Sequence, residues 1–167
     1  NIVSTGSNML GIALNGGYIG GLPVTIDGEV LNQEATNKGN ISFGDNSTGI
    51  YVINGASGEN QGTIEVGQHS VGMYGSGTGS SIANIGAVSI GNNSAIGVYG
   101  VNGATIQNNT NNVSIGNGSY GFALKSGSNL VNNTAATLGE NAVLVYGDGA
   151  GTITNNGQLT MTGSNNV

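Results

Sequence analysis

The chain has 167 residues, a formal net charge of −6 at pH 7 and an isoelectric point near 4.1. It contains 33 glycines, one proline and no cysteine, and only 6% of its residues are charged, which is unlike an average globular domain. Neutralising phosphate groups requires clustered Lys and Arg, so a chain with two basic residues is not a nucleic-acid binder. The absence of cysteine also excludes a disulfide scaffold and a cysteine-based zinc site.

Residues 1–38 are predicted to form a first coil that is interrupted by an insertion. The segment 6–14 matches the later segment 116–124, but Gly6 precedes its next equivalent, Gly44, by 38 residues. That step exceeds the usual repeat, and the excess, about residues 15–36, predicts an excursion from the coil with an extra short strand at residues 24–31. Because insertions on solenoids often carry binding, we expect a candidate ligand site within residues 16–32, at Tyr18, Asp27 and Glu29.

Residues 39–167 repeat one unit of 22–25 residues. The unit restarts at Gly39, Gly62, Gly86, Asn111, Ala135 and Gly157. Each copy opens with an alternating segment such as Val88-Ser-Ile90, continues through a Gly-bounded corner into a second apolar segment, and ends with a weaker third apolar column. The pattern predicts an all-β fold, a right-handed parallel β-helix of about six to seven coils. The copy that restarts at Ala135 fits the repeat least well, because its alignment puts the polar Thr137 at a position that is apolar and in the core in the other copies.

An asparagine stands two positions before each restart, which predicts a ladder of stacked carboxamides. Equivalent residues of successive coils lie about 4.8 Å apart, so side chains at one phase can hydrogen-bond along the axis. The predicted ladder consists of Asn37, Asn60, Asn84, Asn109, Asn133 and Asn155.

A second column is aromatic and is predicted to face outward. Tyr51, Tyr74, Tyr99 and Tyr146 share one phase, and Ala13 and Ala123 occupy it in other coils. Alternation along the strand puts the flanking apolar residues inside and this column outside. Exposed tyrosines offer a stacking surface for sugars or partner side chains. The alternative is that neighbouring rings stack on one another and shield the sheet.

The charged residues predict an ion pair rather than catalytic machinery. Lys125 and Asp148 stand at the same phase of adjacent coils, two residues beyond the aromatic column. Glycoside hydrolysis needs two carboxylates about 5–10 Å apart, whereas Asp45 and Glu140 share a phase but lie four coils apart. His69 is the sole histidine, so no second histidine can complete a metal site with it, and we expect it to be a solvated residue of a corner. The sequence therefore predicts no catalytic residue, no metal site and no cofactor.

The repeat can be written Gly-x-Val/Ile-x-Ile-Gly-x-x-Ser-x-Gly-Val-Tyr-Gly, followed after a loop by Ile-x-Asn-x-Gly. It resembles the passenger region of bacterial type V autotransporters, and most closely the large fusobacterial outer-membrane adhesins of the RadD type. The resemblance covers nearly the whole chain and implies a segment displayed on the surface of a Gram-negative cell, anchored in the outer membrane through a C-terminal β-barrel outside these residues. It implies attachment to a surface protein or glycan of another bacterium or of a host cell.

Three functions are compatible with the sequence. We expect an adhesive surface scaffold without catalytic activity, cut from a longer passenger. A carbohydrate-active β-helix enzyme is suggested by analogy of fold. A structural spacer that projects a distal binding tip is the third, and adhesion that survives deletion of these coils would favour it.

Overall fold

The computed structural model describes residues 1–19, 22–27, 29–30, 33–110 and 112–167, and in these ranges all regular structure is β-strand. Within them no helix is long and apolar enough to cross a membrane.

Three parallel sheets run along the molecule. Sheet 1 contains β1 (Ile2–Val3), β8 (Asn40–Phe43), β11 (Thr63–Val66), β14 (Ala87–Ile90), β17 (Asn112–Ile115), β20 (Ala135–Leu138) and β23 (Leu159–Met161). Sheet 2 contains β2 (Leu10–Asn15), β9 (Thr48–Ile53), β12 (Val71–Ser76), β15 (Ile96–Val101), β18 (Tyr120–Lys125) and β21 (Val143–Asp148). Sheet 3 contains β7 (Glu34–Asn37), β10 (Ser57–Asn60), β13 (Ser81–Asn84), β16 (Thr105–Asn108), β19 (Asn129–Asn132) and β22 (Ile153–Asn155).

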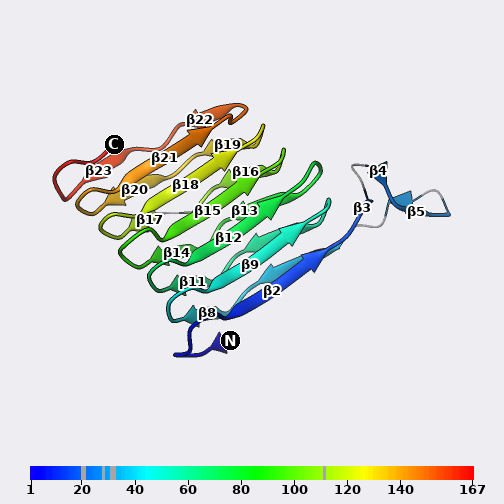
Figure 1. The fold of residues 1–167 in the computed structure, drawn as a ribbon, viewed down its shortest axis with the longest axis horizontal. Coiled ribbons are helices and arrows are strands. Elements are labelled where there is room, and N and C mark those ends of the chain that lie inside the picture. Colours follow the sequence, from blue (N-terminus) through cyan, green and yellow to red (C-terminus); the bar gives the residue numbers. More distant parts are fainter. Residues whose placement is uncertain (20–21, 28, 31–32, 111) are drawn as a thin grey trace.

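The chain visits the three sheets in turn, which confirms the predicted parallel β-helix. In Figure 1 the sheet 2 strands run across the front, the sheet 3 strands return behind them, and successive coils advance from the N end to the C end in the right-handed sense. In the described ranges, five coils are complete and uninterrupted, from β8–β9–β10 to β20–β21–β22. The predicted six to seven coils also counted the first coil, which the excursion interrupts, and the single strand β23.

The excursion lies between the end of β2 at Asn15 and the start of β7 at Glu34, and it contains two antiparallel hairpins rather than one extra strand. β3 (Tyr18–Ile19) pairs with β4 (Leu22–Pro23), and β5 (Thr25–Ile26) pairs with β6 (Glu29–Val30). The strand predicted at residues 24–31 extends to residue 31, which lies outside the described residues, as does the predicted restart at Asn111. Figure 1 draws these hairpins outside the stack of coils.

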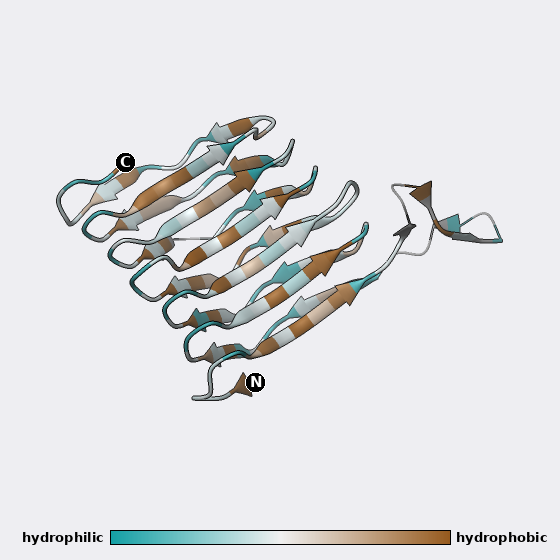
Figure 2. Cartoon of the chain, viewed as in Figure 1, coloured by the Kyte–Doolittle hydropathy of each residue, from teal (hydrophilic) through white to brown (hydrophobic). Residues whose placement is uncertain are grey.

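Alternation along each strand builds the core. In β11, Ile64 and Val66 are buried and Glu65 between them is exposed, and the same alternation recurs in the neighbouring strands of sheet 1. Apolar and polar colours accordingly alternate along the strands in Figure 2. Burial of the inward column of each sheet, at about 25 cal/mol per Å² of apolar area, holds the coils closed.

Core residues of facing sheets compensate for one another in size. Gly58 of sheet 3 lies against Val52 of sheet 2, and a Cβ at Gly58 would come within 2.6 Å of the Val52 Cγ2 atom. In the next coil the sizes are reversed, because a Cβ at Gly75 of sheet 2 would come within 2.8 Å of the Ile82 Cδ1 atom of sheet 3. In these two coils, an interior packed to crystal-like density holds one large residue at this contact.

The predicted asparagine ladder exists, with two of its members corrected. Side-chain amides donate along the axis from Asn37 to Asn60 (2.8 Å), Asn60 to Asn84 (2.9 Å), Asn84 to Asn108 (2.7 Å), Asn108 to Asn132 (2.6 Å) and Asn132 to Asn155 (2.7 Å). Asn109 and Asn133, which were predicted as members, are exposed instead. They belong to a second, outer ladder in which Asn156 donates to Asn133 and Asn133 donates to Asn109, both over 2.8 Å.

One extra residue causes the error at Asn109. Between the ladder asparagine and the following strand there are two residues after Asn84, but three after Asn108, since β17 begins at Asn112. Counting two positions back from the predicted restart at Asn111 therefore gives the exposed Asn109 instead of the buried Asn108.

The error at Asn133 has another cause: only two residues separate Asn132 from β20, so the restart predicted at Ala135 falls one residue late. The late restart also misplaced Thr137, which pairs with the exposed Ser114 of sheet 1, while Ala136 and Leu138 fill the core positions.

Candidate ligand-binding face

The tyrosine column lies on the outer side of sheet 2, as predicted. Parallel pairing puts Ala13, Tyr51, Tyr74, Tyr99, Ala123 and Tyr146 in register along the axis. The residues on either side of Tyr51, Ile50 and Val52, are fully buried, whereas Tyr51 itself is half-buried. The strand alternation therefore presents these rings at the surface, and we call this outer side of sheet 2 the tyrosine face.

Three of the rings pack on one another. Tyr51 and Tyr74 are stacked, with centroids 4.9 Å apart and planes 6° apart. Tyr74 and Tyr99 meet edge to face, with centroids 5.5 Å apart and planes 83° apart. Both arrangements are favourable for aromatic pairs. The predicted alternative, in which neighbouring rings stack on one another, therefore describes Tyr51, Tyr74 and Tyr99. These three rings form an aromatic strip whose outer edge is accessible to a partner.

Ala123 interrupts the strip and leaves a hollow of about 320 Å³. Its lining consists of Ile96, Tyr99, Tyr120, Ala123, Lys125 and Tyr146. The methyl group of Ala123 forms the floor because the side chain is too short to fill the slot that tyrosine occupies elsewhere, and the residue is only 5% exposed. Tyrosine rings border the hollow on both sides along the axis.

The repeat pattern of the sequence does not mark Tyr120 as a site residue. It lies three residues before Ala123 on β18, and its ring meets Tyr146 of the next coil edge to face, with centroids 5.9 Å apart and planes 69° apart. Its phase carries Leu10, Thr48, Val71, Ile96 and Val143 in other coils, so no aromatic column marked it. Strand alternation counted back from Ala123 would turn Tyr120 inward, and Tyr120 is accessible because two consecutive residues, Gly121 and Phe122, are buried.

The predicted ion pair borders the same hollow. The Lys125 ammonium lies 3.3 Å from the Asp148 carboxylate, and the two side chains are 40% and 61% exposed. Hydrogen bonding to Asp148 raises the pKa of Lys125 above its ordinary 10.5, with smaller contributions in the same direction from the phenols of Tyr99 and Tyr146 and from the charge of Asp148. The hollow therefore has an aromatic body and one polar end at Lys125, and the Asp148 carboxylate lies just beyond the lining, 3.3 Å from the Lys125 ammonium.

The remaining predicted ligand residues lie apart from this hollow. Tyr18 is in β3 and Glu29 in β6, while Asp27 follows β5 with a positive φ of 51°. Asp27 and Glu29 are exposed. Figure 1 draws the hairpins that carry these residues outside the stack of coils.

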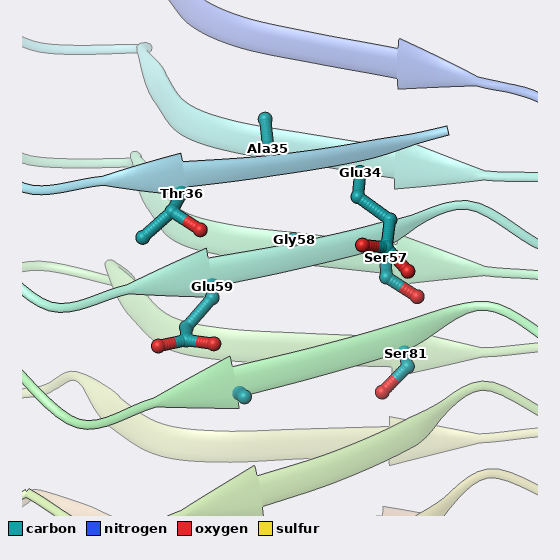
Figure 3. Close-up of a pocket in the computed structure, with 8 residues that line it drawn as sticks. Glu34, Ala35, Thr36, Ser57, Gly58, Glu59 and Ser81 are labelled. Carbon is teal, nitrogen blue, oxygen red and sulfur yellow. The ribbon is translucent and has the colours of Figure 1, made fainter. Parts of the chain in front are cut away.

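The outer side of sheet 3 carries a polar groove of about 210 Å³. Figure 3 shows Glu34 and Glu59 on neighbouring strands, reaching over different parts of the groove, with Ser57 and Ser81 beside them. The Glu59 carboxylate accepts a hydrogen bond from the Gln61 side chain. Among the residues in the described ranges, no three His, Asp or Glu side chains gather into a group that could hold a metal ion.

The two corner residues singled out from sequence have local roles. His69 is exposed and has a positive φ of 53°, the conformation that asparagine adopts in the equivalent corners at Asn46 and Asn93. One carboxylate oxygen of Asp45 accepts a 2.8 Å hydrogen bond from the backbone N–H of Gln68 in the next coil. Both residues thus shape the corner between sheets 1 and 2.

Comparison with known proteins gave no match: no protein-family model, curated protein or solved structure showed significant similarity to the chain.

Proposed function

We propose that this chain is an adhesive segment of a cell-surface passenger, which attaches to another bacterium or to a host cell through the tyrosine face. The observation that carries the proposal is the column of Tyr51, Tyr74, Tyr99 and Tyr146, held in register on the outside of a rigid sheet. Tyrosine and other large aromatic side chains are enriched where proteins bind partners, because they offer apolar area, a hydroxyl group and few rotatable bonds.

The scaffold favours binding without catalysis. The inner strands of sheet 2, β9 to β18, are hydrogen-bonded to parallel neighbours on both sides, so the rings of Tyr51, Tyr74 and Tyr99 hold their spacing and lose little conformational entropy when a partner binds. The tyrosine face carries no carboxylate pair of the kind that glycoside hydrolysis requires. The expected partner is a surface protein or a glycan. The resemblance to autotransporter passengers implies that the chain is located outside the cell, on an outer membrane.

Attachment of coated beads tests the proposal. Beads carrying the wild-type chain are expected to attach to bacterial or epithelial cells, and beads carrying the double variant Tyr51→Ser, Tyr74→Ser are expected to attach no better than uncoated beads. The matched control, Gln107→Ser with Val131→Ser, changes two outward residues of sheet 3 and should attach like wild type.

The outcomes separate the three functions. Equal attachment by wild type and the tyrosine double variant would refute the role of the tyrosine face. Attachment by neither the wild type nor any variant would favour a spacer, whose adhesive part lies elsewhere. Release of reducing sugar ends from cell-surface polysaccharide by the wild-type chain would favour the enzyme.

A further inference from the structure

The hollow at Ala123 has the dimensions of a slot for one ring. Tyr99 and Tyr146 precede and follow Ala123 in the same column, two strand steps apart, which is about 9.6 Å between their backbones. A flat guest in contact with both neighbours needs about 3.5–4.0 Å on each side, or roughly 7–8 Å in all. One ring can therefore lie over Ala123, where the column lacks its own.

The walls of the hollow suit a guest with apolar faces. Tyr99, Tyr120 and Tyr146 contribute aromatic surface, and Ile96 with the Ala123 methyl contributes aliphatic surface. The volume of about 320 Å³ is at the small end of the range for ligand pockets, about 300–1,000 Å³. A small ring or the terminal unit of a chain fits such a space, while a folded surface does not enter it.

The polar end selects the chemistry of the guest. Lys125 offers only donors and Asp148, when ionised, only acceptors, and they lie 3.3 Å apart. A hydroxyl group is both donor and acceptor, so neighbouring hydroxyls can bond to both side chains. A cationic guest would meet Lys125, and an anionic guest would meet Asp148 on a chain with a net charge of −6. The balanced pair favours a neutral guest.

We propose that the hollow at Ala123 binds a neutral pyranose ring of a surface glycan, with its C–H faces against Tyr99 and Tyr146 and its hydroxyls toward Lys125 and Asp148. The inference rests on the proposed adhesive function and narrows its partner to a carbohydrate. A proline ring of a protein partner matches the aromatic walls but has no hydroxyls for the polar end.

The test is a titration of the wild-type chain with three probes, methyl β-D-glucopyranoside, methyl β-D-galactopyranoside and methyl α-D-mannopyranoside, followed by amide chemical shifts. At least one probe is expected to shift the amides of Tyr120, Ala123 and Tyr146 in a saturable way. The variant Ala123→Tyr fills the hollow with the residue found at this phase in neighbouring coils, and it should weaken binding at least about ten-fold. Ala13→Tyr adds the same ring at the other alanine of the column and should bind like wild type.

A second variant covers the case in which Ala123→Tyr fails to fold. Lys125→Met keeps the apolar walls but removes the donor, and it should also weaken the binding of the glycoside. Saturable shifts that are unchanged in Ala123→Tyr, or the absence of saturable shifts with all three glycosides, would overturn the inference. Saturable shifts with N-acetylproline methylamide but with none of the glycosides would overturn it too and would assign the slot to a peptide ring. If the glycosides fail while wild-type beads attach and the Tyr51, Tyr74 double variant does not, the adhesive function stands and only the sugar site falls.

Discussion

The side-chain amide of Asn84 donates a 2.7 Å hydrogen bond to the carboxamide oxygen of Asn108, one coil further along the axis. Both side chains are fully buried. Each buried amide in the ladder is thereby satisfied by its neighbours, although a lone one would cost about 1–3 kcal/mol. The ladder fixes the register of the coils, and so the alignment of the tyrosine column on sheet 2.

Asn108→Ala is expected to be strongly destabilising. The substitution removes the acceptor of the Asn84 amide and the donor to the Asn132 oxygen, which leaves two buried groups without these partners. At about 1–3 kcal/mol for each group, the free energy of unfolding should fall by roughly 2–6 kcal/mol. Urea unfolding followed by circular dichroism measures it.

The adjacent residue provides the control for this prediction. Asn109→Ala removes a member of the exposed outer ladder and should change the free energy of unfolding by less than about 0.5 kcal/mol. Equal losses for the two variants would contradict the assignment of Asn108 to the inner ladder and Asn109 to the outer one.

Gly58→Ile is expected to overpack the core against Val52 and to lower the free energy of unfolding by about 1–3 kcal/mol. The double variant Val52→Gly, Gly58→Ile reproduces the arrangement of Gly75 and Ile82 in the next coil, so it should recover most of the loss. A double-mutant cycle measures the coupling between the two sites, and strict additivity would show that the two residues do not share one space.

His69→Val is expected to destabilise the corner between sheets 1 and 2. The positive φ of 53° is disfavoured for a β-branched residue, so the cost should be about 1–2 kcal/mol. Asparagine occurs at positive φ in the equivalent corners, and His69→Asn should therefore be neutral or stabilising. Thermal unfolding of the two variants side by side tests this, and a better tolerated valine would refute it.

Asp148→Asn is expected to lower the pKa of Lys125, because the hydrogen bond that raises it loses its charged acceptor. With a pKa above 10.5 in the folded state, the contribution of the pair to stability is present below pH 10.5 and is lost as the pH rises through the folded pKa. Titration of the lysine side-chain NMR signals measures the shift, and a Lys38→Met background leaves a single lysine to observe. An unchanged pKa in the variant would mean that the pair does not form in solution.

Features that repeat at a constant phase could be predicted from the sequence. The β-helix, the outward tyrosine column and the pairing of Lys125 with Asp148 all follow from strand alternation combined with a step close to 24 residues. These predictions hold because a parallel register carries equivalent residues directly over one another.

Features that depend on single insertions or on ring orientation could not be predicted. One extra residue after Asn108 moved the ladder from Asn109 to its neighbour, and nothing in the composition of that corner says which amide points inward. The contact of Tyr120 with Tyr146 depends on how the two rings turn around the short side chain of Ala123, and a phase count carries no such information.

Competition with soluble protein tests most directly whether the tyrosine face is the adhesive surface. Beads coated with the wild-type chain are mixed with cells in the presence of increasing soluble wild-type chain or of soluble Tyr51→Ser, Tyr74→Ser variant, both verified as folded by circular dichroism. If the tyrosine face is the adhesive surface, soluble wild type abolishes attachment and the soluble variant leaves it unchanged. Equal inhibition by the two soluble proteins would contradict it.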